Sequence, residues 1–339
     1  MRSYSLFIGI DISKKWFDAR LAINGEIKQM PHGRFDNTRK GFKELLHFIK
    51  KDSRYPGTLK QCVFCMEHTG VYTLPLCKFL QDKKLFYVLE SPYHLKKSLG
   101  LVREKNDRLD AAHIARYAYL HREELNCFSL PSDRLLKIKS LLSLRKRLVD
   151  AKKGLQVAAK ELKDFAPLSV SKMVTKQTKT TTKPIKTSIL AVEKEVLMLI
   201  KEEPELNRIF ELAISVKGVG LIIAAHLLVY TLGFTAFDDA RRFATYIGIV
   251  PFGKSSGTSI KAPAKVSHFA NKKLKGLISA GASSATLWDK ELKAYYQRRI
   301  ADGKNKFSVQ NAIRNKFVHR IFAVVKRGTP YVELAQHRV

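Results

Sequence analysis

Leucine recurs every seven residues through the middle of the chain, at Leu141, Leu148, Leu155 and Leu162, with Leu144, Ala151, Ala158 and Phe165 at the complementary positions. A repeat of this length predicts a long helix with one apolar seam. A second helical stripe follows at Ile189, Val192, Val196 and Leu199. The two helices can pair as a helical hairpin within one chain or as a coiled coil between chains, and the pattern favours neither.

The residues between these stripes, 166–188, are rich in Lys, Thr and Ser. Such a composition offers little apolar surface to bury, so it predicts a flexible basic connector that becomes ordered on nucleic acid. The helical segment, with this connector inside it, is expected to span residues 126–205.

The chain before this segment alternates between two patterns. Short apolar runs at 6–10, 16–22, 61–66 and 85–89 predict strands, and helical spacing is found at 38–49, 74–80 and 107–120. Strands interleaved with helices are typical of an α/β domain, which we expect to cover residues 1–125.

Residues 206–339 are expected to form a mostly α-helical C-terminal domain. Lys217, Gly218 and Gly220 precede an apolar helix at 221–232 and resemble a helix-hairpin-helix element. In such an element the glycine turn directs backbone N–H groups at a DNA phosphate. A plain glycine turn between two core helices explains these residues equally well.

The chain has 62 Lys and Arg against 30 Asp and Glu in 339 residues, a net charge of +32. This excess predicts a polyanionic partner, with nucleic acid the leading candidate and a ribosomal or membrane surface the alternative. No leader peptide or run of about 18 apolar residues suggests export or a membrane span. The hydrophobic fraction of 45% is that of an ordinary globular protein.

Cys62 and Cys65 have the spacing of a zinc or redox motif but lie inside a predicted strand. Their odd separation directs the two side chains to opposite faces of a sheet. We therefore expect buried, reduced thiols in a cytoplasmic protein. The isolated histidines His68, His113 and His268 do not suggest a zinc site.

The most one-sided charge lies in residues 241–288, which hold eight Lys and Arg and no Asp or Glu. At the centre of this stretch is a hydroxyl-rich loop, Ser255–Ser259, flanked by Lys254, Lys261 and Lys265. Glycine allows a backbone to approach a ligand closely and cations attract anions, so we expect this loop to meet a phosphate.

Four acids of the N-terminal region are candidate metal ligands: Asp11, Glu67, Asp107 and Asp110. Asp11 and Glu67 end predicted strands, and Asp107 and Asp110 lie three residues apart on one helix face. Carboxylates gathered at a sheet edge repel one another unless cations such as Mg²⁺ fill the site, where paired metals support phosphoryl transfer. Taken singly, Asp107 also fits a helix cap and Glu67 an exposed loop acid.

Several segments resemble the motifs of one family, the insertion-sequence-110 type of DEDD transposases. They are, in chain order, residues 7–14, 65–72, 105–111, 216–220, 243–251 and 255–259. The resemblance extends over nearly the whole chain in the family's order, apart from residues 166–188.

The resemblance implies a ribonuclease H/RuvC-like N-terminal domain, a coiled coil and a transposase domain. The acidic tetrad would be Asp11, Glu67, Asp107 and Asp110 with bound Mg²⁺, and the nucleophile Ser256, with Ser255 directly before it. It further implies an RNA-guided DNA recombinase of the bacterial cytoplasm and nucleoid. Such an enzyme forms a covalent serine–DNA intermediate and acts as a dimer or tetramer, one protomer's acids working with another's serine.

The sequence is also compatible with two other functions. A RuvC-like nuclease would hydrolyse branched DNA with metal-bound water and use the serine loop only to hold phosphate. A non-catalytic nucleic-acid-binding protein would need neither the acids nor the serine.

Overall fold

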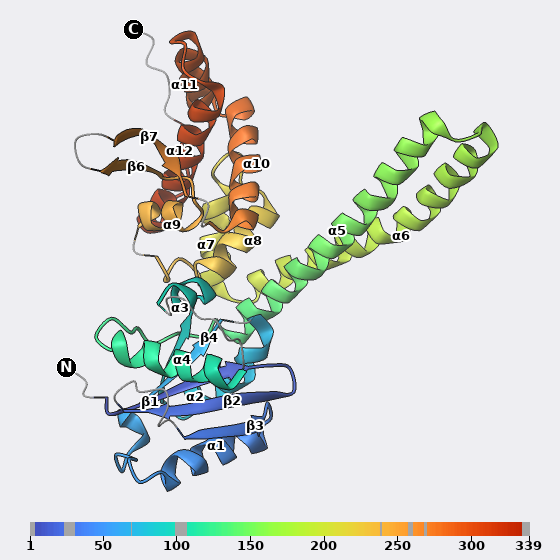
Figure 1. The fold of residues 1–339 in the computed structure, drawn as a ribbon. Helices are drawn as coiled ribbons and strands as arrows, with labels where there is room; N and C mark the ends of the chain where they lie inside the picture. Colours follow the sequence, from blue (N-terminus) through green and yellow to red (C-terminus); the bar gives the residue numbers. More distant parts are fainter. Residues whose placement is uncertain are drawn as a thin grey trace. The chain divides into compact units, whose positions relative to one another are not determined.

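The computed structural model describes residues 4–23, 31–68, 70–98, 107–237, 239–256, 260–267 and 270–333. The chain divides into two compact units, 1–130 and 131–339, which are described separately (Figure 1). In the described part of the chain, no helix is both long and apolar enough to cross a membrane.

The first unit is a mixed α/β domain, which confirms the predicted class. Its strands are β1 (Leu6–Ile12), β2 (Trp16–Ala22), β3 (His32–Asp36), β4 (Cys62–Glu67) and β5 (Phe86–Glu90). Its helices are α1 (Arg39–Lys51), α2 (Leu74–Asp82), α3 (Pro92–Ser98) and α4 (Asp107–Leu120), with short 3-10 turns η2 (Leu59–Gln61) and η3 (Gly70–Thr73).

The five strands form one sheet in the order β3-β2-β1-β4-β5. Strands β1, β2 and β3 pair antiparallel, whereas β1, β4 and β5 run parallel. The carboxyl ends of β1, β4 and β5 therefore lie at the same edge of the sheet. Strand β3 is not evident from the sequence, because its residues are mostly polar and only partly buried.

Each face of the sheet packs on its own helices (Figure 1). One core joins Ile8, Ile10 and Phe64 to α1 and α2. The other joins the alternate residues, such as Phe7 and Val63, to α3 and α4. This alternation confirms the opposite orientation of Cys62 and Cys65, which belong to the two different cores.

Gly9 sets how closely α4 lies against the sheet. A Cβ atom at this position would be 2.1 Å from both the carbonyl oxygen of Ala111 and the amide nitrogen of Ala115. Because Ala111 and Ala115 are also small and fully buried, strand and helix backbones meet directly.

The second unit is mostly helical, as predicted. Its helices are α5 (Asp133–Phe165), α6 (Leu168–Lys201), α7 (Pro204–Ile214), α8 (Leu221–Tyr230), α9 (Ala240–Tyr246), α10 (Lys272–Trp288), α11 (Lys290–Ala301) and α12 (Lys306–Arg327). A two-stranded sheet, β6 (Pro251–Ser256) and β7 (Ile260–Val266), interrupts the helices.

Helices α5 and α6 pack along each other as a long hairpin (Figure 1). The predicted flexible connector at 166–188 is therefore wrong, because only Ala166 and Pro167 separate the two helices. Packing against α5 overrides the weak helix propensity of the Thr-rich segment. Its threonines also satisfy their hydroxyls within the helix, as where Thr182 Oγ1 donates to the Thr178 carbonyl oxygen at 2.7 Å.

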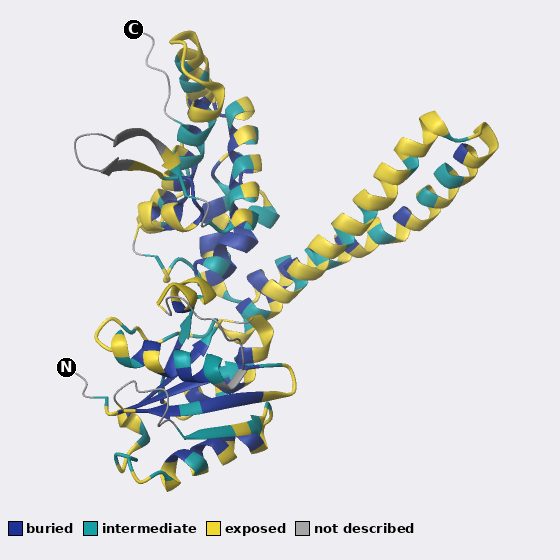
Figure 2. Ribbon diagram, in the orientation of Figure 1, coloured by how far each residue is buried: buried dark blue, intermediate teal, exposed yellow. Residues whose placement is uncertain are grey.

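The leucine repeat is only partly buried within the single chain. Leu141 and Leu148 are half-buried nearer the base of the hairpin, whereas Leu155, Leu162 and Phe165 are 39%, 41% and 89% exposed. Figure 2 shows that the hairpin is the most exposed part of the second unit. Pairing of α5 with α6 thus leaves apolar side chains uncovered toward the hairpin tip.

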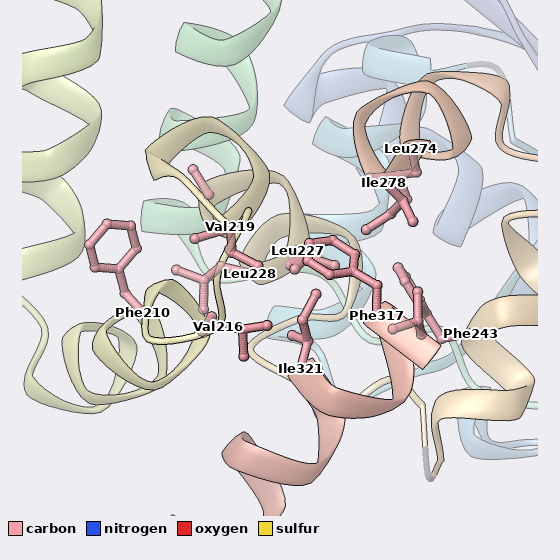
Figure 3. Packing of buried hydrophobic residues seen from close by; sticks show 14 of the residues in the cluster. Phe210, Val216, Val219, Leu227, Leu228, Phe243, Leu274, Ile278, Phe317 and Ile321 are labelled. Carbon is pink, nitrogen blue, oxygen red and sulfur yellow. The ribbon is translucent and has the colours of Figure 1, made fainter. Parts of the chain in front are cut away.

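The core of the second unit joins the base of this hairpin to the remaining helices. Phe210, Leu228, Phe243, Ile278 and Phe317 pack in one cluster although they come from five different helices (Figure 3). This cluster is the frame that positions the β6–β7 hairpin.

We predict that Gly9→Ala destabilises the first unit by about 3 kcal/mol, because the new methyl group must push α4 off the sheet. Gly154→Ala is the matched control: no atom lies within 4 Å of a Cβ at this exposed helical position. It should stabilise the protein by about 0.5–1 kcal/mol through helix propensity. Chemical unfolding followed by circular dichroism measures both effects, and equal stability of Gly9→Ala and wild type would contradict the close packing.

Candidate active site

Asp11 and Glu67 lie at the same edge of the sheet. Ile10 pairs with Met66 in the parallel register of β1 and β4, so Asp11 and Glu67 are the next pair of positions. Asp11 comes two residues after Gly9, and Glu67 two residues after Cys65, and both Gly9 and Cys65 face α4. Alternation along a strand therefore directs both carboxylates to the face covered by α4.

Helix α4 runs antiparallel to β1, which brings its first turn to these acids. The Phe7 ring contacts Tyr119 near the end of α4, with ring centroids 5.5 Å apart, and Gly9 contacts Ala115 and Ala111. Two residues extend about 6.6 Å along a strand, which nearly matches the length of about 6 Å that four residues extend along a helix. Continuing this register places Asp11 opposite the first turn of α4.

That first turn contains Asp107 and Asp110. Asp110 is partly buried, whereas the side chain of Asp107 lies outside the described part of the structure. His113 follows one turn later, and burial lowers its pKa, with Arg116 adding to the effect and Asp110 opposing it. His113 is therefore neutral near pH 7 and adds no positive charge beside Asp110.

Glu90 is a further acid at this edge that the sequence analysis missed. It ends β5 and is the register partner of Glu67. Its carboxylate is held by the Ser91 amide at 3.3 Å, by His94 Nδ1 at 3.2 Å and by the Tyr117 hydroxyl of α4. Burial and Glu90 together raise the pKa of Tyr117 to about 12, so Tyr117 remains a hydrogen-bond donor. The signal was present, since Glu90 ends its strand just as Glu67 does.

We call Asp11, Glu67, Glu90, Asp107 and Asp110 the acidic edge. Among the described side chains, no three His, Cys, Asp or Glu residues are gathered closely enough to hold a metal ion. The fold thus brings the acids to one side of the sheet, and those whose side chains are described do not form a compact ligand set.

Asp18 lies beside the acidic edge but is neutralised. It is the register partner of Asp11 and is 1% exposed. Burial raises its pKa, but hydrogen bonds from Arg34, with Nη2 at 2.8 Å, and from His32 at 2.6 Å outweigh burial and leave the pKa lowered. The buried charge is therefore compensated from β3, the strand that the sequence pattern did not reveal.

Ser256 ends β6 at the turn of the β6–β7 hairpin. Its register partner is Ile260, and Ser255 pairs with Lys261. The side chains of Ser255 and Ser256, and residues 257–259, lie outside the described part of the structure. The candidate nucleophile is thus placed by the backbone of a strand end.

The base of this hairpin is tied firmly to the helical core. Asn311 Nδ2 donates to the Ile249 carbonyl oxygen at 2.7 Å, and Lys275 Nζ donates to the Gly248 carbonyl oxygen at 2.8 Å. Gly248 has φ +69°, and a Cβ there would be 2.3 Å from Cβ of Ala270. Lys275, one of the eight cations of the basic stretch, therefore has a structural contact.

The predicted phosphate-binding lysines lie on the two strands of the β6–β7 hairpin. Lys265 lies on β7 with an exposed side chain, whereas the side chains of Lys254 and Lys261 lie outside the described structure. Lys254 pairs with Ala262 in the backbone register, so these lysines belong to the same two-stranded hairpin as Ser256.

The glycine turn before α8 has a clear packing role. Gly218 has φ +94°, and a Cβ there would be 2.4 Å from the Gly281 carbonyl oxygen on α10. Lys217 Nζ pairs with the Glu333 carboxylate at 2.6 Å. Gly220 differs, because no atom lies within 4 Å of its hypothetical Cβ and its backbone begins α8 without a side-chain cap. A phosphate therefore has room to approach the backbone at Gly220, whereas Gly218 is packed against α10.

The three buried cysteines of the first unit, Cys62, Cys65 and Cys77, are shielded from reaction, whereas Cys127 is exposed. Burial raises the pKa of Cys62 and of Cys77 to about 12, and it also raises that of Cys65. Their thiols remain protonated near neutral pH, which supports the interpretation of the C-x-x-C spacing as structural.

An α/β domain with an acidic edge, together with a cationic helical unit, has the parts of an enzyme that acts on nucleic-acid phosphates. A family model described as "Transposase", for the DEDD type of IS110, matches residues 8–161. A second, described as "Transposase IS116/IS110/IS902 family", matches residues 211–297. The chain belongs to the IS110 family of transposases and is thus a DNA transposase/recombinase by class.

Curated relatives agree with this assignment. The chain is 27% identical to the pilin gene-inverting proteins of Moraxella bovis and Moraxella lacunata over 335 residues, covering 96% of this chain and 97% of each relative. It is 33% identical over 117 residues to an uncharacterized 43.6 kDa protein of insertion element IS110 from Streptomyces coelicolor, covering 34% of this chain and 29% of that protein.

We predict that Arg34→Met makes the first unit sensitive to mild acid. Asp18 has a lowered pKa, so its stabilising ion pairs are present above its unfolded value of 3.8 and are lost as pH falls through the lower folded value. Without Arg34, the free energy of unfolding should fall by roughly 2 kcal/mol near pH 7, and the remaining contribution should disappear at a higher pH than in wild type. Unfolding curves between pH 3 and 7 measure this, and parallel pH profiles would contradict it.

Gly218 and Gly220 should respond differently to alanine. Gly218→Ala should destabilise the second unit by about 3 kcal/mol, because α8 and α10 must separate. Gly220→Ala should change stability by less than about 1 kcal/mol yet weaken DNA binding if a phosphate approaches that backbone. Thermal unfolding and DNA-binding titrations separate the two effects, and unchanged DNA affinity in Gly220→Ala would remove the turn from the DNA interface.

Proposed function

We propose that the protein is the recombinase of an insertion sequence, cutting and rejoining DNA through a covalent bond between Ser256 and a DNA phosphate. The observation that carries the proposal is the convergence of acids from β1, β4 and the first turn of α4 on one side of the sheet.

We further propose that the first unit is a ribonuclease H/RuvC-like domain. Three antiparallel strands and two further parallel strands in the order β3-β2-β1-β4-β5 support this finer assignment. In this arrangement the end of β1 lies at the centre of the sheet, where Asp11 can be flanked by Glu67 on one side and the α4 acids above.

Asp11, Glu67, Asp107 and Asp110 would hold Mg²⁺. Their oxygens are the donors that this ion takes, and the donor set fits because carboxylates on adjacent strand ends and one helix turn share a single face. When bound, the metal would supply charge stabilisation for phosphoryl transfer. Glu90 lies next to Glu67 but already accepts hydrogen bonds, so we assign it to holding α4 through Tyr117.

Ser256 is the proposed nucleophile. Its Oγ would attack a DNA phosphorus, forming the Oγ–P bond while the bond from phosphorus to a deoxyribose oxygen breaks. No His or acid occurs within residues 241–266 to take the serine proton. A serine hydroxyl is a weak nucleophile without such help, so the acidic edge of another protomer would activate it.

Nucleic acid is the expected partner throughout the second unit. The proposal assigns Lys254, Lys261 and Lys265 to the scissile phosphate and Lys217 with Gly220 to the DNA backbone. Lys217 is bound to Glu333 in the free chain, so DNA would have to displace that carboxylate. A structured guide RNA would account for the remaining positive charge, and the name of the pilin gene-inverting relatives supports DNA rearrangement as the reaction.

The hairpin formed by α5 and α6 supports a homo-oligomer, a dimer or tetramer. Leu155, Leu162 and Phe165 stay exposed after the two helices pair, as do Leu168 and Met173 on α6. Apolar side chains in a heptad register are what a coiled coil between protomers would cover.

We predict that Ser256→Ala abolishes the covalent protein–DNA adduct, whereas Ser255→Ala, the adjacent hydroxyl, retains it. Full-length protein, its co-purified RNA and a labelled DNA substrate are incubated with Mg²⁺ and denatured, and the adduct is detected by its reduced gel mobility. The expected loss exceeds about a hundredfold, because a nucleophile has no substitute.

The other outcomes identify rival functions. Wild-type adduct levels in Ser256→Ala would refute the assigned nucleophile. DNA cleavage without any adduct would indicate a metal-dependent nuclease acting on branched DNA, and binding without cleavage would indicate a non-catalytic nucleic-acid-binding protein.

A further inference from the structure

A small cavity of about 310 Å³ lies among α10, α11 and α12 in the second unit. Most of its wall is formed by residues of α10 and α12 that lie about one helical turn apart on each helix. The lining residues are Ser279, Ala282, Ser283, Thr286 and Leu287 of α10, Tyr296 of α11, and Lys306, Gln310, Ile313 and Arg314 of α12. This volume is near the lower end of ligand pockets, enough for a phosphate with part of its sugar.

Arg314 is the unusual member of this lining. It is partly buried, and burial alone lowers its pKa. No acid is among the described lining residues, and no hydrogen bond or ion pair of Arg314 is found within the described structure. Arginine in other partly buried places of this unit has an acid partner, as Arg145 has Glu193 at 2.6 Å and Arg320 has Asp289 at 2.8 Å. Placing a guanidinium in a cavity without a counter-ion is unfavourable unless an anion joins it.

The other polar groups of the cavity fit an anion as well. Ser279 and Thr286 already donate their hydroxyl hydrogens to carbonyl oxygens one turn back. Ser283, Tyr296 and Gln310 have no such hydrogen bond within the described structure, so each can donate to a ligand. With Lys306, the cavity offers donors and positive charge and no carboxylate.

Two exposed aromatic residues directly follow cavity-lining residues in the sequence. Phe307 follows the lining residue Lys306 and is 76% exposed, and Trp288 follows Leu287 and is 72% exposed. Exposed rings next to a cationic pocket suit unpaired bases, which stack on aromatic faces, whereas a duplex keeps its bases inside.

We infer that this cavity binds a backbone phosphate of an unpaired nucleotide strand, with Arg314 as its main ligand and Phe307 or Trp288 as a stacking surface for an adjacent base. Residues of the serine hairpin and of the glycine turn do not line this cavity, although Lys217 Nζ of the turn donates to the Trp288 carbonyl oxygen at 3.4 Å. It rests on the proposed function in that it names a way in which the enzyme holds a single-stranded segment of its nucleic-acid partners. RNA and DNA strands share this chemistry, and the test distinguishes them.

The test uses full-length Ser256→Ala protein, which should bind without reacting, and fluorescence anisotropy with labelled single-stranded RNA, single-stranded DNA and duplex DNA. Arg314→Met removes the charge and keeps an unbranched stem. Lys326→Met is the matched control, since Lys326 is an exposed cation of the same helix outside the cavity. Phe307→Ala tests stacking.

Arg314→Met should weaken binding of one or both single strands by about tenfold. It should also lower the slope of log affinity against log salt concentration by about one. Lys326→Met should change affinity less than about twofold. Phe307→Ala should weaken single-strand binding at least about fivefold and leave duplex binding unchanged. The strand that loses more affinity, RNA or DNA, identifies the occupant.

Thermal unfolding separates binding from structure. Removing a partly buried cation without a partner should leave the melting temperature of Arg314→Met unchanged or higher. Equal effects of Arg314→Met and Lys326→Met, equal losses for duplex and single strands, or a lower melting temperature with unchanged affinity would each overturn the inference.

Adduct formation is measured in parallel with proteins that retain Ser256. A normal adduct with no effect of Arg314→Met refutes only the cavity proposal, and loss of the adduct with an intact Arg314 effect refutes only the proposed chemistry.

Discussion

The contact between Gly9 and the backbone of α4 determines the geometry of the first unit. Without a side chain at Gly9, the helix lies directly on β1 and runs antiparallel to it. Asp11, two residues further along the strand, then faces the first turn of α4. Acids that are distant in sequence are thereby brought to one edge, because the parallel register of β1 and β4 adds Glu67 to the same face.

In the second unit, the helical core positions the short β6–β7 hairpin. Hydrogen bonds from Asn311 and Lys275 hold the carbonyl groups that precede β6, and Gly248 permits the turn between α9 and that strand. Gly218 lets α8 approach α10 closely. Several residues that look suited to phosphate in the sequence thus serve the packing that positions Ser256.

The sequence predicts the elements whose apolar periodicity is strong. The strands β1, β2, β4 and β5 and helix α4 follow from it, and so does the opposite orientation of Cys62 and Cys65. Strand β3 has no apolar alternation, because its residues serve mainly to neutralise Asp18 through Arg34 and His32. The first part of α6, residues 168–188, could not be predicted from its Lys- and Thr-rich composition, since its stability comes from packing along α5. Candidate ligands at strand ends could be found from sequence, but Arg314 could not, because only the fold shows that it lies in a cavity without an acid.

The central claim is that the acidic edge is a metal site assembled from two strand ends and one helix turn. Anomalous X-ray diffraction from crystals of the full-length protein with Mn²⁺, which takes the same oxygen ligands as Mg²⁺, tests it most directly. The account predicts an anomalous peak about 2.1 Å from carboxylate oxygens of Asp11 and of at least one of Glu67, Asp107 and Asp110. No peak at this edge in millimolar Mn²⁺, or a peak bound by other residues, would contradict it.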